Sequence, residues 1–154
     1  MRSLILVVLI IVMMGSPLWG QTPGSDDDHI DALLASSGLS WGQAAWLVGR
    51  SVGILEEFTD FEQSSRQALN LGWGSPELES ETPVDLAVYC ELLMKSHKIS
   101  GGIFYTLFPG PRYAYRELAF KKIIPPRIPP DGMVSGQQAL LFLQNLRSHQ
   151  ENPQ

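Results

Sequence analysis

The fold of this 154-residue chain is decided by a short phrase that occurs three times. The copies are Ser40-Trp41-Gly42-Gln43, Thr82-Pro83-Val84-Asp85 and Ser135-Gly136-Gln137-Gln138. In each copy, an amide or carboxylate follows a Ser or Thr by three residues, and an apolar run comes next. This is the form of a capping box, in which the hydroxyl accepts from the third backbone N–H and the third side chain reaches back. The predicted cap residues are Ser40 with Gln43, Thr82 with Asp85, and Ser135 with Gln138.

A shorter apolar stretch precedes each phrase, so the repeating unit reads as helix, loop and capped helix. The predicted units cover residues 30–56, 58–98 and 112–147, within one domain over 30–147. The chain has no long alternating run of β-branched residues. We therefore expect an all-α fold of about six helices in three pairs of a short and a long helix, with no substantial sheet. Glycines within the first long helix predict close approach of another backbone.

This pattern resembles the S-layer homology (SLH) family, in which three helix–loop–helix units pack into a pseudo-threefold bundle. The resemblance covers Ile30 to Leu146 and implies the same bundle and a place in the cell envelope. In the family, the Arg of a Thr-Arg-Ala-Glu-like phrase helps to hold an anionic cell-wall glycan. Here Trp41, Pro83 and Gly136 take that place, and none of them makes a charged bidentate contact. The resemblance therefore implies fold and location more than glycan binding.

Residues 1–20 have the sequence pattern of a secretory signal peptide. Arg2 is its only charge, an apolar run covers Leu4 to Met14, and the breakers Gly15-Ser16-Pro17 follow. The run is shorter than the roughly 20 apolar residues that a membrane-spanning helix needs. We expect export and no stable membrane span after cleavage; an uncleaved N-terminal anchor is the alternative.

Polar stretches at both ends of the mature chain predict a disordered lead-in over residues 21–29 and a flexible tail over 148–154. Cys90 is the only cysteine, so an internal disulfide is excluded, and we expect it to be a buried small hydrophobe. An exported domain of this size without a disulfide is typical of a bacterial periplasm or envelope.

Charge is divided along the chain. Acids dominate from Asp26 to Glu91, and bases dominate from Lys95 to Arg127, where Glu117 is the only acid. The net charge of −5 argues against a nucleic-acid partner. The basic stretch either pairs with the protein's own acidic half, which we favour, or faces an anionic polymer or lipid head groups.

The segment Gly101–Lys122 interleaves aromatic and basic residues and is the candidate working surface. Two interpretations remain open. In one, the apolar residues of 103–108 fold onto the core; in the other, they form an exposed aromatic platform beside cations. The candidate binding residues are Tyr105, Arg112, Tyr113, Arg116 and Trp73.

No catalytic or metal-binding constellation stands out. The histidines, His29, His97 and His149, have no metal-ligand spacing, and no nucleophile motif occurs. We expect a non-catalytic envelope or periplasmic binding module without a cofactor. Its expected partner is an anionic cell-wall polymer or another envelope protein. The alternative is a structural adaptor subunit of a periplasmic assembly with no glycan ligand.

Overall fold

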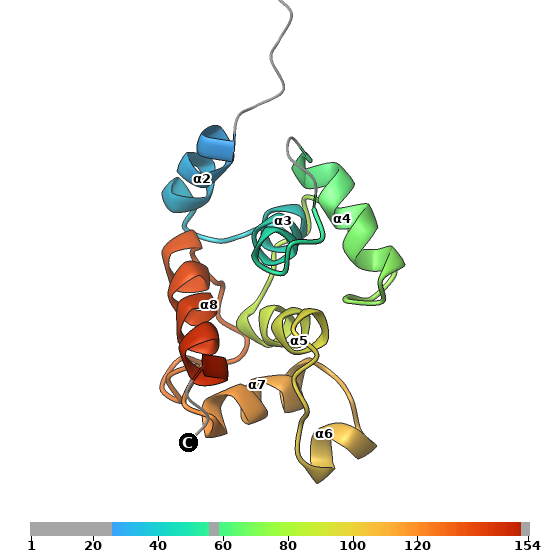
Figure 1. Ribbon diagram of the computed structural model, residues 1–154, viewed down its shortest axis with the longest axis vertical. Coiled ribbons are helices and arrows are strands. Elements are labelled where there is room, and N and C mark those ends of the chain that lie inside the picture. Colours follow the sequence, from blue (N-terminus) through green and yellow to red (C-terminus); the bar gives the residue numbers. More distant parts are fainter. Residues whose placement is uncertain (1–25, 56–58, 152–154) are drawn as a thin grey trace, which may run out of the picture.

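The computed structural model describes residues 26–55 and 59–151, so the predicted signal peptide lies outside the described residues. The described residues form seven helices and no strand, and two isolated β-bridges join loops (Figure 1). This confirms the predicted all-α class. The helices are α2 (Asp26–Ala35), α3 (Trp41–Ser51), α4 (Phe61–Asn70), α5 (Leu86–Ser96), α6 (Ile103–Leu107), α7 (Pro111–Phe120) and α8 (Gly136–Glu151).

Both ends of the domain are more ordered than the sequence predicts. Residues 26–29, expected in a disordered lead-in, form the first turn of α2. Residues 148–151, expected in a flexible tail, continue α8. The ring of His29 explains the first difference, because it packs 4.7 Å from the ring of Phe61 and 5.2 Å from that of Trp46. This aromatic contact ties the start of α2 to α3 and α4.

Two of the three long helices begin with a complete capping box. Ser40 Oγ accepts from the Gln43 amide at 3.4 Å, and Gln43 Oε1 accepts from the Ser40 amide at 3.0 Å. The same pair of bonds joins Ser135 and Gln138, at 3.2 and 3.0 Å. Each capping box supplies hydrogen-bond acceptors for backbone amides at the helix start, which have no acceptor within the helix.

The third long helix, α5, begins three residues later than the sequence predicts. Its N-cap is Asp85, whose carboxylate accepts from the Val88 amide at 2.8 Å. Thr82, the predicted cap, instead accepts from the Glu79 amide at 3.0 Å in the preceding turn. The prediction was wrong because Thr-Pro-Val-Asp also has the capping-box spacing.

The corrected cap register is marked by a buried apolar residue directly before each cap. Leu39, Val84 and Val134 are each 1% exposed and stand before Ser40, Asp85 and Ser135. Leu39 and Val84 also share a backbone bond, with the Val84 amide donating to Leu39 at 2.9 Å. These residues hold the loops in front of the long helices together.

The corrected register makes a direct stability prediction. Asp85→Ala should lower the free energy of unfolding by about 1 kcal/mol, because an amide of α5 loses its only side-chain acceptor. Thr82→Ala should cost only about 0.5 kcal/mol, because it removes a single hydrogen bond in a turn and no helix cap. Chemical denaturation of both variants is the test. A larger loss for Thr82→Ala would restore the original register.

Each long helix packs against the short helix of another unit. Helix α3 lies on α4, α5 lies on α7, and α8 lies on α2 (Figure 1). Backbone bonds at the first residue of each long helix follow the same order. They run from the Trp41 amide to Thr82 O at 2.8 Å, from Leu86 to Gly132 O at 2.9 Å, and from Gly136 to Ser36 O at 3.2 Å. The first unit therefore contacts the second, the second contacts the third, and the third contacts the first. The full pseudo-threefold arrangement stays a prediction.

The core between the long helices is dense and contains Cys90. This thiol is fully buried, and burial raises its pKa, with a further contribution from Asp85. Beside it, the buried Tyr89 hydroxyl donates to Ala139 O of α8 at 3.0 Å. Cys90 is the buried small residue that the sequence predicts, and Tyr89 links α5 to α8.

Four helices end with a residue in the left-handed conformation. The residues are Gly53 (φ 71°), Gly72 (φ 73°), Lys98 (φ 52°) and Lys122 (φ 59°). Gly53 therefore terminates α3 rather than standing within it, which shortens the predicted helix. Lysine carries a Cβ penalty in this region that glycine does not.

Replacing either lysine should stabilise the protein. Lys98→Gly and Lys122→Gly should each raise the free energy of unfolding by roughly 0.5–1 kcal/mol, because the backbone strain disappears. Lys95→Gly, inside α5, should instead lower it, because glycine weakens the helix interior and the ion pair with Glu91 is lost. Equal destabilisation by all three changes would show that the lysine side chains matter more than the backbone.

Candidate binding surface

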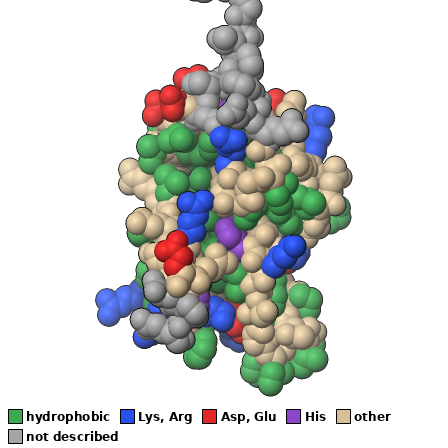
Figure 2. All heavy atoms as spheres, in the orientation of Figure 1, with side chains coloured by type: hydrophobic (Ala, Val, Ile, Leu, Met, Phe, Trp, Pro, Cys, Tyr) green, Lys and Arg blue, Asp and Glu red, His purple; other side chains and the backbone are tan. Residues whose placement is uncertain are grey.

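Helix α6 presents its apolar side chains to solvent. The exposed fractions are 76% for Ile103, 68% for Phe104, 64% for Leu107 and 60% for Phe108. Figure 2 shows hydrophobic side chains gathered at the lower right, where Figure 1 places α6. The interpretation in which the apolar residues of 103–108 fold onto the core is therefore wrong for these four side chains. Clustered exposed apolar residues of this kind mark interaction surfaces.

The side chain that attaches α6 to the body is Tyr105. It is half-buried against the core, and burial raises its pKa, with a contribution from Glu91. Its ring covers Gly101, where an added Cβ would lie 2.6 Å from the Tyr105 Cβ. Tyr105, a predicted binding residue, therefore positions α6 and leaves the other apolar side chains outside.

A stack of side chains joins α6 to α7. The rings of Phe108 and Tyr113 lie 6.2 Å apart and are nearly parallel, at 29°. The guanidinium carbon of Arg116 lies 5.7 Å from the centre of the Tyr113 ring, which is cation–π distance. The structure thus brings together two of the predicted residues, Tyr113 and Arg116, with Phe108 completing the stack.

The outer side of α7 carries a row of exposed side chains. Arg112, Arg116 and Phe120 are spaced four residues apart, so they share one face of the helix, and Phe120 is 85% exposed. Together with α6 this row forms one surface, which we name the α6–α7 face. Its members are Ile103, Phe104, Leu107, Phe108, Arg112, Arg116 and Phe120.

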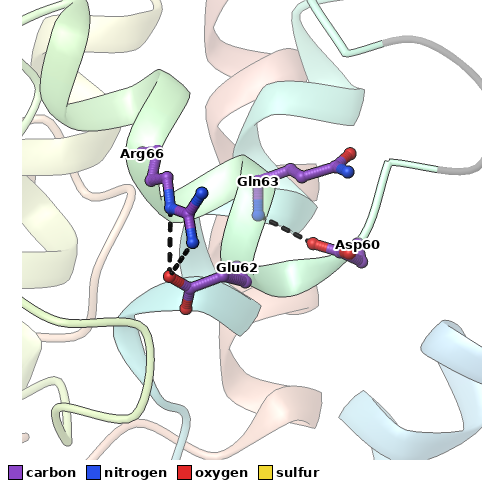
Figure 3. Close-up of polar contacts among 4 residues, drawn as sticks. All are labelled: Asp60, Glu62, Gln63 and Arg66. Atoms are coloured by element: carbon purple, nitrogen blue, oxygen red, sulfur yellow. Dashed lines mark hydrogen bonds and ion pairs between the residues drawn. The ribbon is translucent and has the colours of Figure 1, made fainter.

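Within the described residues, Arg112 and Arg116 form no ion pair with the acidic half of the chain. Among the described residues, ion pairs join Glu62 to Arg66 at 2.8 Å and Glu91 to Lys95 at 2.9 Å. Both pairs are local, one turn apart; Figure 3 shows the first beside the Asp60 cap of α4. Neither pair includes Arg112 or Arg116. The favoured expectation of pairing between the two halves is therefore wrong for these arginines, which keep their positive charge available.

Trp73, the remaining predicted binding residue, does not reach the surface. It is 8% exposed and belongs to the hydrophobic core, in the loop after α4. A contact with an external partner requires exposed ring area, so Trp73 leaves the list of candidate surface residues. Its burial follows from the end of α4, where its amide bonds to Ala68 O at 3.0 Å and turns the chain inward.

A concave region lies beside the helix caps. It is an open groove of about 450 Å³ lined by residues that include Ser40, Gln43, Phe61 and Met133, and the one charged side chain in its described lining is Glu81. In the corrected register, the place of the family's Arg is taken by Trp41, Leu86 and Gly136, all of them buried. This groove therefore offers no cation to an anionic glycan.

His97 lies where three long helices meet. His97 Nε2 lies 3.3 Å from Ser51 Oγ, and Arg147 donates to Ser51 O at 3.2 Å, so the C-terminal parts of α3, α5 and α8 meet there. In the described part of the chain, no three His, Cys, Asp or Glu side chains gather as metal ligands. His97 thus acts as a link between long helices.

This link gives a pH prediction. Burial lowers the pKa of His97 below its ordinary 6.5, Arg147 lowers it further, and the Leu93 carbonyl offsets part of the shift. The unfolded chain therefore binds a proton on this histidine at a pH where the folded chain does not. The contribution to stability is full above the ordinary pKa of histidine and falls as the pH drops below it. Melting curves of His97→Asn from roughly pH 8 to 5 should show a weaker pH dependence than the parent. Parallel curves would contradict this origin.

Comparisons with protein-family models, with characterised proteins and with solved structures find no match for this chain. Within the described ranges, no helix combines the length and apolar character needed to cross a bilayer. Function must therefore be argued from the α6–α7 face itself.

Proposed function

We propose that this chain is an exported, non-catalytic binding module that docks on a component of the bacterial cell envelope through the α6–α7 face. The observation that carries the proposal is the exposure of four large apolar side chains of α6 and its C-terminal cap, each at 60% or more, beside Arg112 and Arg116 of α7, which form no ion pair with any described residue. Export is proposed from the N-terminal sequence, where a single base precedes an apolar run and helix breakers.

The SLH resemblance supports an envelope location, but the residues favour a different surface from that of the family. The cap positions that correspond to the family's Arg are occupied by buried residues, and the adjoining groove carries the acidic Glu81. An anionic cell-wall polymer would meet repulsion there and attraction at Arg112 and Arg116. The proposed binding surface is therefore the α6–α7 face.

The alternative function is a structural adaptor within a periplasmic assembly, with only protein contacts. The absence of charge on α6 favours this alternative, because Ile103, Phe104, Leu107 and Phe108 would serve any apolar groove on a partner protein. Salt separates the two, since contacts made through cations weaken with ionic strength and apolar contacts do not.

Sedimentation with isolated cell envelopes tests the proposal. The purified protein should sediment with envelopes, and the double variant Arg112→Gln with Arg116→Gln should lose most of this binding while its melting temperature barely changes. Arg66→Gln, an exposed arginine on α4, is the matched control and should bind like the parent. Binding that depends neither on the salt concentration nor on the two arginines would favour the structural adaptor. No envelope binding at all would overturn the proposed function.

A further inference from the structure

The α6–α7 face provides apolar contact area and positive charge, but few other groups for directional hydrogen bonds. It offers apolar side chains on α6 and guanidinium groups on α7. Apart from the two guanidinium groups, which donate to anionic oxygens, it offers few hydrogen-bonding side chains, because the Thr106 hydroxyl already donates to Gly102 O at 3.1 Å and Tyr105 is turned toward the core. A glycan is recognised through many directional hydrogen bonds, which this face does not supply. Its composition instead matches a ligand that is apolar inside and anionic at its surface.

The shape of α6 also favours a ligand with an apolar interior. The helix is short, five residues long, and stands out at the lower edge of the molecule (Figure 1). Ile103 and Leu107 are four residues apart, as are Phe104 and Phe108, so the exposed apolar side chains form one broad face, and Tyr105 lies on another side, toward the core. A convex apolar tip of this kind can sink into a fluid hydrocarbon layer without a preformed groove.

The arginines are placed to meet anionic groups at the rim of that tip. Arg116 lies over the Tyr113 ring, which stacks on Phe108 at the end of α6, so the Tyr113 ring links the cation to the apolar tip. Phe120 extends the apolar character to the far end of the same row on α7. Arginine keeps its stem in an apolar layer while its head group reaches phosphate, which is the behaviour expected at a membrane interface.

We infer that the α6–α7 face binds peripherally to an anionic phospholipid bilayer, with α6 inserted among the acyl chains and Arg112 and Arg116 on the phosphates. The inference rests on the proposed function, because export is what brings the chain to an envelope membrane. It names the bilayer as the docking partner; a cell-wall polymer or a protein is the competing outcome.

Vesicle sedimentation with the purified protein tests the inference. Binding is expected to vesicles of phosphatidylglycerol with phosphatidylcholine and to be much weaker with phosphatidylcholine alone. Arg112→Gln with Arg116→Gln should weaken it roughly 30-fold, at the usual contribution of a base near an anionic surface. Phe104→Ser with Phe108→Ser should weaken it by about tenfold or more through the lost apolar area. The exposed Leu141 of α8 gives the matched control, Leu141→Ser, which should bind like the parent.

A labelled variant gives a readout that does not depend on deleting side chains. Because Cys90 is fully buried, a polarity-sensitive dye should attach selectively at Phe104→Cys. Its emission should shift to the blue on the anionic vesicles, whereas the same dye at Leu141→Cys should not respond. An unchanged spectrum at position 104 would overturn the insertion of α6.

The remaining outcomes separate this inference from the proposed function. Binding to lipid-extracted cell walls through Arg112 and Arg116, with none to vesicles, overturns the bilayer and leaves the envelope function standing. Equal binding to both vesicle types, unaffected by the arginine changes, overturns the phosphate contacts. Binding to neither vesicles nor envelopes overturns both.

Discussion

Gly136→Ala should unfold a large part of the molecule. Gly136 opens α8, and a Cβ there would overlap the carbonyl of Leu33 in α2, a backbone atom that cannot rotate away. The two helices would have to separate, which breaks the contact that joins the last unit to the first. We expect a loss of about 3 kcal/mol or more in the free energy of unfolding, at the upper end of overpacking effects. Thermal and urea denaturation measure it.

The control for this change is another glycine. Gly110, before α7, has extended backbone with φ of 168°, and nothing lies within 4 Å of a Cβ built on it. Gly110→Ala should change stability by no more than about 0.5 kcal/mol. Similar effects of the two substitutions would mean that α2 does not pack against α8 as described.

Trp41→Arg, the change that would restore the family's phrase at the first cap, should be even more damaging. The Trp41 side chain is fully buried, and removing a buried Trp costs about 3–5 kcal/mol. The incoming guanidinium would also be buried without a partner, at a further cost of several kcal/mol. The sum rivals the entire stability of a typical domain, roughly 5–15 kcal/mol.

We therefore expect Trp41→Arg to be largely unfolded rather than to gain polymer binding. Circular dichroism and the sedimentation of the variant on cell walls are the two measurements. Leu141→Arg, at an exposed position of α8, should remain folded and serves as the control for the added charge. A folded Trp41→Arg protein that binds cell-wall polymer would show that the cap groove is the family-type site after all.

The helical class and the caps at Ser40 and Ser135 were predictable because both depend on local sequence. A capping box is satisfied within four residues, so the spacing of Ser and Gln alone is informative. The start of α5 was harder, because Thr82 and Asp85 both have the chemistry of a cap. The apolar residue before each cap resolves the choice, but only once Leu39, Val84 and Val134 are known to be buried together.

The exposure of α6 was not predictable from hydropathy, because Ile103, Phe104 and Leu107 read as core residues anywhere in a sequence. What keeps them outside is tertiary: α6 has five residues, and Tyr105 alone provides its contact with the core. A signal was nevertheless present in the flanking Gly101-Gly102 and Pro109-Gly110-Pro111, which limit the helix to little more than one turn. The burial of Trp73 depends likewise on packing that no local pattern encodes.

The division of charge along the sequence was informative, but the favoured expectation drawn from it, pairing between the two halves, was wrong for Arg112 and Arg116. Opposite charges in the two halves of the sequence suggested mutual neutralisation. In the described residues, however, the ion pairs are local, from one turn of a helix to the next. Arg112 and Arg116 lie on the outer side of α7, which contacts the apolar helix α6, and neither forms an ion pair with a described residue. This juxtaposition, not the charge count, is what suggests a docking surface.

Amide hydrogen exchange of the protein bound to isolated envelopes tests the account most directly, because it maps contact without any substitution. We predict slower exchange in residues 103–120 on binding, with residues 36–43, in the groove beside the caps, unchanged. Protection confined to residues 36–43, with α6 and α7 exchanging as they do in the free protein, would contradict the α6–α7 face as the working surface.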